Sequence, residues 1–269
     1  MRVTLTVALT LAMMAGAVAV LAQDVVPAAD EQAQPAAMGD RIEDGLIALY
    51  RFDDVIEDLV IPDATATVGG LDLIISDPAE TVTVHDGAVH FAPPGQTVVP
   101  GVFSSGPAVS IVDAVVASGQ LTLEAWVTPA SADQSGPARI VTISHDSSYR
   151  NITLGQTGDS YILRLRTSAT NIQGSPDMVA PEGTVVADQL QHVVVTFDGQ
   201  TTTIYVDGEA VAESTEHAGS VDSWDETMSL VLGNEFDGNR RWYGSIHLVA
   251  FYNHALSPQQ VLTNFEARP

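Results

Sequence analysis

The sequence contains no cysteine and no lysine. Without cysteine there can be no disulfide bond, no thiol catalysis and no lipid anchor on an N-terminal cysteine, so an exported protein of this kind depends on its hydrophobic core, with or without a bound metal. All ten basic residues are arginine, against 34 acidic residues, and the formal net charge is −24. A surface of this charge repels phosphate backbones and anionic membranes, so nucleic acid is not expected as a partner.

Two interpretations of the acidity stay open. The charge could keep the protein soluble in a salty environment, or clustered carboxylates could attract divalent cations. A loss of the fold at low salt, with no requirement for a particular divalent ion, would favour the first interpretation.

Several catalytic sequence motifs are also missing. There is no G-x-S-x-G nucleophile elbow, no H-E-x-x-H zinc motif and no phosphate-binding glycine loop. The pattern E-x-D-x-x-E, which places two carboxylates on one face of a strand as a glycosidase requires, is absent as well. His145-Asp146-Ser147 contains the residue types of a catalytic triad, but sequence neighbours rarely converge correctly, and we interpret the tripeptide as a surface loop. The sequence therefore predicts a protein that is not an enzyme.

The first 22 residues have the composition of an export signal. One arginine precedes a long apolar run that ends in Val-Leu-Ala before Gln23, and we expect residues 1–22 to be a cleaved Sec-type signal peptide. A retained membrane anchor is the alternative, because the run nearly reaches spanning length. Residues 23–44 are rich in Ala, Pro, Gln and acidic residues, which predicts a flexible linker. The mature protein would be secreted, periplasmic or on the cell surface, without membrane insertion.

Residues 45–269 contain short apolar or alternating runs that are separated by Gly, Asp, Asn and Pro. The runs have strand length and are rich in β-branched or aromatic residues. Their recurrence predicts an all-β domain, a two-sheet antiparallel β-sandwich of the jelly-roll type. Two short helices are expected as exceptions, Ser110–Ser118 with Ser110 as N-cap, and Ser257–Ala267 with Ser257 as N-cap and Pro258 at the first helical position.

A three-strand meander is predicted between His192 and Ala212. Val193–Phe197 and Thr203–Val206 alternate as strands and are joined by Asp198-Gly199-Gln200-Thr201, and the turn Asp207-Gly208 leads into the third strand. Aspartate at such turns is favoured because it bonds to the local backbone, so we assign both aspartates to the turns rather than to a cation site.

Four segments, in consistent order, resemble those of laminin G-like and concanavalin A-like lectin/glucanase jelly-roll domains. They are GLIALYRFDD with the loop IPDAT, LTLEAWV, HVVVTFDG with IYVDG, and GSIHLVAFYNHALSPQQV at residues 244–261. The resemblance covers residues 45–269 and implies the same sandwich, but it says little about the ligand.

Members of this family often hold a calcium ion at the rim of the sandwich, which makes Asp63 a candidate ligand for Ca²⁺. The closing strand has His247 where relatives commonly have an acidic residue, and imidazole is a poor calcium ligand. Strand periodicity places His247 on the same face as Phe251 and opposite Ile246. A metal site made of His247 and His254 is not expected, because they lie on different elements and no third ligand is evident.

A binding module needs aromatic and hydrogen-bonding side chains on an open surface. Trp126 lies in an apolar strand and is expected in the core, whereas the candidates for ligand binding lie in polar stretches: Trp224, Trp242, Tyr149, Arg240 and Arg241. Exposed aromatics beside arginine suit stacking on sugar rings or binding a protein partner; ordinary loop packing and salt bridges are the alternative. The sequence favours a lectin-like module for extracellular carbohydrate, with an adhesive surface protein that binds cell-surface proteins, or a glycoside hydrolase-like enzyme, as alternatives.

Overall fold

The computed structural model describes residues 40–53, 59–65, 70–76, 82–92 and 101–269. The predicted signal peptide, residues 1–22, lies outside these described residues, as does most of the predicted linker. Neither of the two described helices has the length and apolar character needed to cross a membrane.

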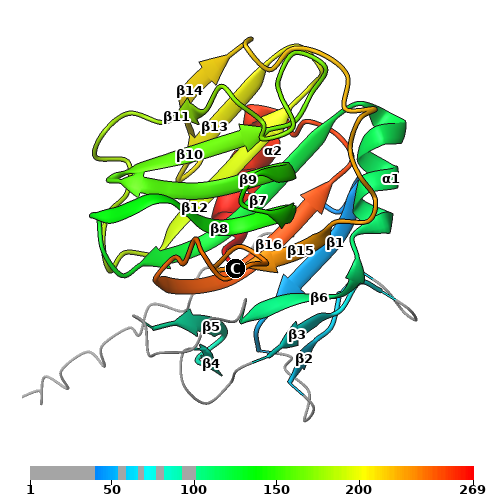
Figure 1. Ribbon diagram of the computed structural model, residues 1–269. Helices are drawn as coiled ribbons and strands as arrows, with labels where there is room; N and C mark the ends of the chain where they lie inside the picture. Colours follow the sequence, from blue (N-terminus) through cyan, green and yellow to red (C-terminus); the bar gives the residue numbers. More distant parts are fainter. Residues whose placement is uncertain (1–39, 54–58, 66–69, 77–81, 93–100) are drawn as a thin grey trace, which may run out of the picture. The chain divides into compact units, whose positions relative to one another are not determined.

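Two antiparallel sheets pack face to face, so the predicted β-sandwich is confirmed (Figure 1). Sheet A contains, in spatial order, β14 (Glu209–Ser214), β13 (Thr202–Val206), β12 (Gln191–Phe197), β7 (Leu121–Pro129), β16 (Gly244–Tyr252), β5 (Ala88–Phe91) and β4 (Val82–His85), and β1 (Leu46–Arg51) also pairs with β16. Sheet B contains β11 (Met178–Val179), β10 (Ser160–Leu165), β9 (Tyr149–Gly158), β8 (Gln134–Asp146), β15 (Ser229–Leu232), β6 (Val102–Pro107), β3 (Leu73–Ile75) and β2 (Val60–Ile61).

The main core lies between the sheets, because alternate apolar residues of both sheets point inward. Helix α1 (Val109–Ser118) contributes Ile111, Val112 and Val115 to this core. The predicted N-cap of this helix is wrong: the cap is Ala108, without a side-chain hydrogen bond. The reason is tertiary, since the Ala108 amide donates to the carbonyl oxygen of Met228 and so fixes where the chain enters the helix.

Helix α2 (Pro258–Ala267) lies on the outer face of sheet A, behind that sheet in Figure 1. Its predicted start is confirmed, with Pro258 in the first turn and a capping box formed by Ser257 and Gln260. A second apolar cluster fills the space between α2 and sheet A. In it, the buried ring of Trp126 stacks on His192 and Phe265, with ring centroids 4.7 and 5.8 Å away.

The same interface contains a buried carboxylate on β7. Glu124 is fully buried, and its Oε1 lies 2.5 Å from Arg41 Nη1 and 2.8 Å from His192 Nε2. Its Oε2 accepts hydrogen bonds from Asn264 Nδ2 at 2.8 Å and from the Tyr252 hydroxyl at 3.3 Å. Arg41 was expected in the flexible linker, but its side chain is 7% exposed. The last part of that segment therefore belongs to the folded domain.

The Glu124 carboxyl group stays ionised despite its burial. Burial alone would raise its pKa, but the hydrogen bond from His192 and the charge of Arg41 outweigh that effect and lower the pKa to about 2. The four groups around it come from two neighbouring strands, from α2 and from the segment before β1. One negative charge thus joins four separate parts of the chain.

Strand β16 contains a β-bulge that the sequence periodicity did not predict. Ile246 pairs with Val127 and Leu248 with Trp126, which leaves His247 as the extra residue. Ile246 consequently belongs to the main core together with Val249 and Phe251, so the predicted placement of Ile246 on the face opposite Phe251 is wrong. A bulge shifts the alternation by one residue, and nothing in a single strand reveals it.

The predicted meander is confirmed as β12, β13 and β14. Asp198 Oδ1 accepts from the amides of Gln200 and Thr201 within its own turn, as expected. Asp207 Oδ1 instead accepts from the amide of His192 at 2.8 Å, so this turn is tied to the start of β12.

The capping box predicts unequal effects of two serine substitutions. Ser257→Ala should destabilise the protein by about 1 kcal/mol, because it removes the side-chain acceptor of the Gln260 amide. Ser110→Ala, in α1, is the matched control and should change stability by less than about 0.5 kcal/mol, since Ser110 is exposed and is not the cap. Urea unfolding monitored by circular dichroism measures both; equal losses would contradict the assignment.

The charge on Glu124 predicts a pH-dependent stability. Because its pKa is lower in the folded state than the ordinary value of 4.5, its contribution is present above about pH 4.5 and is lost as the pH falls toward 2. Glu124→Gln should cost on the order of 3 kcal/mol at pH 7, because Arg41 then lacks its anion. It should also flatten the stability profile in that acidic range.

Glu266→Gln, on the exposed side of α2, is the control for the loss of one carboxylate. Unfolding curves at several pH values compare the two variants with the unmodified chain. A Glu124→Gln protein as stable at pH 7 as the Glu266→Gln control would show that the buried charge does not hold these elements together.

Candidate functional site

The two outer faces of the sandwich differ in what lies on them. Helix α2 covers part of sheet A, whereas among the described residues no helix lies in front of strands β8–β10 of sheet B (Figure 1). Ile143, Ile152 and Leu163 of these strands point into the core, so the residues between them face outward. The outward residues include arginine, serine and threonine, which makes this face polar.

Irregular pairing between β8 and β9 brings an arginine to this face. Ile143 pairs with Ile152, but Ser144 pairs with Arg150, so Asn151 is an extra residue in β9. The bulge turns Arg150 to the same side as Ser144. Arg150 is 0% exposed and Ser144 is 1% exposed.

Arg139, on β8, forms a buried ion pair with Glu235 of the loop after β15. Its Nε donates to Glu235 Oε2 at 3.2 Å, and neither side chain is exposed. Its Nη1 donates to the carbonyl oxygen of Pro137 at 2.7 Å. The other Glu235 oxygen accepts a short hydrogen bond from the Ser144 hydroxyl. The loop is also fixed through its backbone, since the Arg139 amide donates to the carbonyl oxygen of Arg240.

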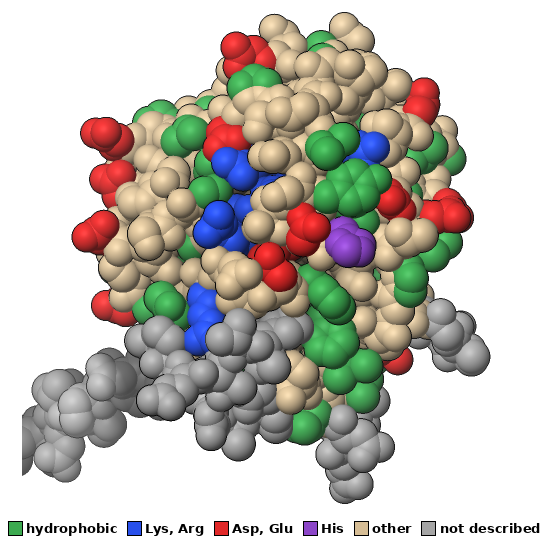
Figure 2. Space-filling view, viewed as in Figure 1, with side chains coloured by type: hydrophobic (Ala, Val, Ile, Leu, Met, Phe, Trp, Pro, Cys, Tyr) green, Lys and Arg blue, Asp and Glu red, His purple; other side chains and the backbone are tan. Residues whose placement is uncertain are grey.

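Three further arginines interact with this pair or with one another. Arg150 interacts electrostatically with Glu235, Arg164, Asp177 and Arg240. Arg164, on β10, holds Asp177 through two parallel hydrogen bonds of 2.7 and 2.8 Å. We call Arg139, Arg150, Arg164 and Arg240 the arginine cluster. Figure 2 shows blue arginine side chains gathered in a band over this part of sheet B.

Part of the cluster has no hydrogen-bond partner among the described residues. Arg139 Nη2 and the Nε and Nη1 atoms of Arg150 are buried and unpaired. The pKa of Arg139 is lowered to about 10. Burial is the largest cause, the positive charge of Arg150 adds to it, and the negative charge of Glu235 opposes both effects. Burial also lowers the pKa of Arg150. The Arg139 guanidinium still carries its positive charge at neutral pH.

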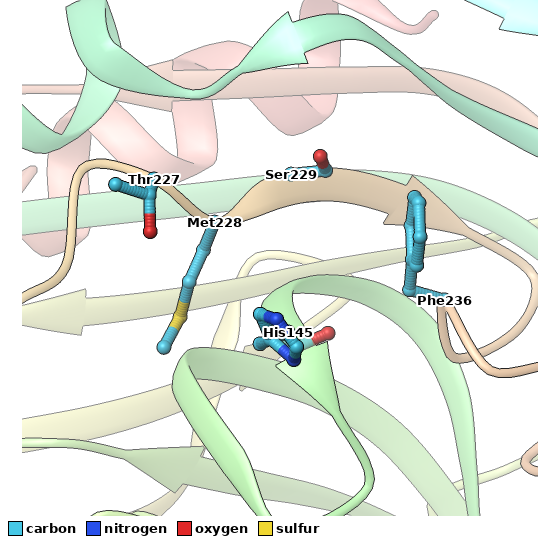
Figure 3. A pocket seen from close by; sticks show the side chains of 6 residues that line it. His145, Thr227, Met228, Ser229 and Phe236 are labelled. Carbon is cyan, nitrogen blue, oxygen red and sulfur yellow. The ribbon is translucent and has the colours of Figure 1, made fainter.

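A hollow of about 200 Å³ lies beside the cluster. Six residues, the hollow's lining, combine hydroxyl groups with apolar side chains: Ser144, His145, Thr227, Met228, Ser229 and Phe236. In Figure 3, Met228 and Phe236 project from the segment around β15 on either side of the hollow, and His145 at the end of β8 faces them. The Phe236 ring is 43% exposed and packs edge-to-face on Phe103.

Both tryptophans predicted to be exposed are buried, so this part of the predicted ligand surface is wrong. Trp242 is 0% exposed and donates from Nε1 to Gln156 Oε1 at 2.8 Å. Trp224 is 7% exposed and donates from Nε1 to the carbonyl oxygen of Arg166 at 2.7 Å. Polar neighbours in the sequence indicate exposure, but each indole N–H is satisfied by an acceptor far away in the sequence.

The remaining predicted ligand residues lie nearer the surface. Tyr149 is half-buried in β9, where its hydroxyl donates to Asp225 Oδ2 at 2.9 Å and the Arg166 guanidinium lies 5.1 Å from its ring centroid. Arg240 is exposed and belongs to the arginine cluster, and Arg241 is half-buried. Of the five predicted residues, the structure brings only Arg240 to the candidate site.

Asp63, the predicted calcium ligand, is buried in the loop after β2. Its Oδ1 accepts from the Leu49 amide at 3.1 Å, the Thr65 amide at 3.0 Å and the Thr65 hydroxyl at 2.8 Å. A cation would therefore have to use the other carboxylate oxygen. No group of three or more His, Cys, Asp or Glu side chains suited to a metal occurs among the described residues, which exclude 54–58 and 66–69. Calcium at Asp63 stays a prediction.

Sequence reasoning missed most residues of the site. Tyr149–Asn151 lie in a polar stretch of the sequence, yet they begin strand β9. One signal was available: the six arginines 139, 150, 164, 166, 240 and 241 all fall in the second half of a chain that has only ten. The sequence cannot show that strands β8–β10 carry three of them side by side.

Comparison with known proteins identifies the fold. A sequence profile of the concanavalin A-like lectin/glucanases superfamily matches residues 103–262. No curated protein has a matching sequence. Solved structures with a similar fold include the Trypanosoma rangeli sialidase in complex with 2,3-difluorosialic acid, with a TM-score of 0.60 and 16% identity over 83% of this chain and 33% of that chain.

Two further similar structures are domains of a neurotoxin and of an arabinanase. The binding domain of botulinum neurotoxin DC in complex with rat synaptotagmin II has a TM-score of 0.60 and 10% identity, over 83% of this chain and 51% of that chain. Domain 4 of AbnA, an extracellular arabinanase from Geobacillus stearothermophilus, in complex with arabinotriose, has a TM-score of 0.55 and 19% identity, over 83% and 98%. The chain spans about a third of the sialidase, and these identities show a common fold only.

The burial of Trp242 predicts that its removal acts on stability. Trp242→Ala should destabilise the protein by about 3–5 kcal/mol, because it leaves a cavity in the core and deprives Gln156 of a hydrogen bond. Thermal and urea unfolding measure the loss. A Trp242→Ala protein with unchanged stability but impaired ligand binding would contradict the buried position and restore Trp242 as a contact residue.

Proposed function

The chain belongs to the concanavalin A-like lectin/glucanases superfamily, and on this basis we propose that it is a non-catalytic module that binds extracellular carbohydrate on the outer face of sheet B. The observation that carries the proposal is the composition of the hollow. The exposed Phe236 ring offers apolar contact, while the hydroxyls of Thr227 and Ser229 offer hydrogen bonds. A sugar ring has apolar C–H faces and a hydroxyl rim, and this combination of groups matches both.

The similar structures support carbohydrate as the ligand class without identifying a sugar. The arabinanase domain corresponds to this chain over 98% of its own length, and its structure contains arabinotriose. The structure of the neurotoxin binding domain, in contrast, is a complex with a protein, rat synaptotagmin II. A protein partner is therefore the alternative that the experiment has to separate from a glycan.

The state of the two most buried glutamates supports a non-catalytic role. Glu124 has no exposed surface and a pKa of about 2, so it cannot give up a proton as a general acid near neutral pH. Glu235 is held by Arg139 and Ser144 and is equally buried. His145 and Asp146 are exposed neighbours at the end of β8, with His145 Nδ1 and Asp146 Oδ2 3.5 Å apart.

We also propose that the protein acts outside the cytoplasm, after export directed by residues 1–22. This rests on the sequence pattern of that segment. An acidic protein without cysteine needs no disulfide to fold there.

A glycan array with the purified mature chain tests the proposal. We expect binding to a defined set of glycans, and a loss of affinity of about tenfold, or about 1.4 kcal/mol, in Phe236→Ala, because that side chain forms one wall of the hollow. Leu190→Ala is the matched control: Leu190 is 38% exposed, close to the 43% of Phe236, but lies before β12 in sheet A.

The outcomes separate the alternatives. Glycan binding that is weakened by Phe236→Ala and not by Leu190→Ala supports the proposed site. Glycan binding that neither change affects would place the carbohydrate elsewhere on the domain. A folded protein that binds no glycan would reject carbohydrate recognition and favour a protein partner, and release of reducing sugar from any bound polysaccharide would reject the non-catalytic role.

A further inference from the structure

We propose that the hollow and the arginine cluster form one site for a carbohydrate that carries an anionic group, either the carboxylate of a uronic acid or a sulfate ester. The inference rests on the proposed function and adds the chemical class of the ligand to it. Three observations carry it: the local charge balance, the unpaired guanidinium nitrogens and the position of Ser144 between the two parts.

The charge balance at the cluster is opposite to that of the whole chain. The guanidinium groups of Arg139, Arg150 and Arg164 share the carboxylates of Glu235 and Asp177, and the charge of Arg240 acts on Arg150 as well. The chain as a whole carries a formal charge of −24. Burying an excess of positive charge is unfavourable unless an anion compensates it. A ligand with one negative group supplies that compensation.

The unpaired nitrogens indicate where the anion binds. Arg139 already uses Nε and Nη1, and Arg164 holds Asp177 with two nitrogens. Arg150 donates only from Nη2, to the carbonyl oxygen of Ser147, and its Nε and Nη1 remain unpaired although the residue is fully buried. Arginine binds carboxylate and sulfate oxygens through such donors. Arg150 is therefore the expected anchor of the anionic group.

Ser144 connects the hollow with the cluster. It lines the hollow, pairs with Arg150 across β8 and β9, and donates to Glu235, the partner of Arg139. A sugar ring that occupies the hollow thus lies against Ser144, whose partner across the two strands is Arg150. The arrangement places neutral contacts on the ring and positive charge beside it, as recognition of an acidic sugar requires.

The net charge limits how acidic the ligand can be. A densely charged polyanion would be repelled by the acidic remainder of the surface, whereas an oligosaccharide with a single acidic residue meets mainly the local positive charge. We therefore infer a glycan with isolated uronate or sulfate groups. Binding should weaken as salt screens the attraction.

Isothermal titration of the mature chain with three matched probes tests the inference. The first probe is an oligosaccharide with one uronate residue, and the second is the methyl ester of the same oligosaccharide. In the third probe, a neutral sugar that bears one sulfate ester replaces the uronate. We expect at least tenfold tighter binding of the uronate than of its methyl ester. The sulfate probe shows whether a carboxylate or a sulfate is the natural source of the charge.

Arg150→Gln should abolish the preference for the charged probe, while the affinity for the methyl ester stays within twofold. Arg51→Gln is the matched control, since Arg51 is an exposed arginine on β1 of sheet A. Circular dichroism establishes that each variant is folded. If Arg150→Gln does not fold, Arg240→Gln replaces it, because Arg240 is the exposed member of the cluster, and a threefold or larger loss of the preference is expected.

Equal affinity for the uronate and its methyl ester would overturn the inference and leave the proposed function standing. A charge preference that survives in the folded cluster variant would also overturn it, because the anion would then bind elsewhere. Failure to bind any of the probes, or any glycan on the array, would reject both the inference and the proposed function.

Discussion

The negative charge of Glu124 is the constraint on which the arrangement of sheet A depends. It lies on the central strand β7 and is neutralised by Arg41 from the segment before β1, with His192, Tyr252 and Asn264 completing its hydrogen bonds. An ionised carboxylate in an apolar interface is tolerated only when it is paired and fully hydrogen-bonded. The requirement forces helix α2 and the entering chain onto the same face of the sheet.

This arrangement divides the sandwich into a structural and an open side. The outer face of sheet A is covered by α2 and a second apolar cluster. The outer face of sheet B has no such helix among the described residues and instead carries the arginine cluster and the hollow. Both faces contain a buried arginine–glutamate pair, but the pair on sheet A is fully satisfied around its carboxylate, whereas that on sheet B leaves guanidinium nitrogens unpaired.

Local patterns in the sequence were good guides where backbone chemistry decides the structure. The meander, the capping box at Ser257 and most of the longer strands follow from alternation, turn residues and capping, which act over a few residues. Burial of individual aromatics could not be inferred in this way. Trp242 follows two arginines and looked exposed, but it lies in the core because Gln156, on another strand, accepts its N–H.

The sequence by itself determined that this chain forms two antiparallel sheets, that its second helix begins at Ser257–Pro258 and that it carries a formal net charge of −24. Only the tertiary structure decided which side chains share a surface. Arg139 and Glu235 form a hydrogen bond although they lie 96 residues apart in the sequence, and Glu124 and Asn264 do so at a separation of 140 residues. These meetings depend on strand order and on bulges that turn single residues to the other face, as at His247 and Arg150. Register and strand order are properties of the whole assembled sheet, so no local pattern contains them.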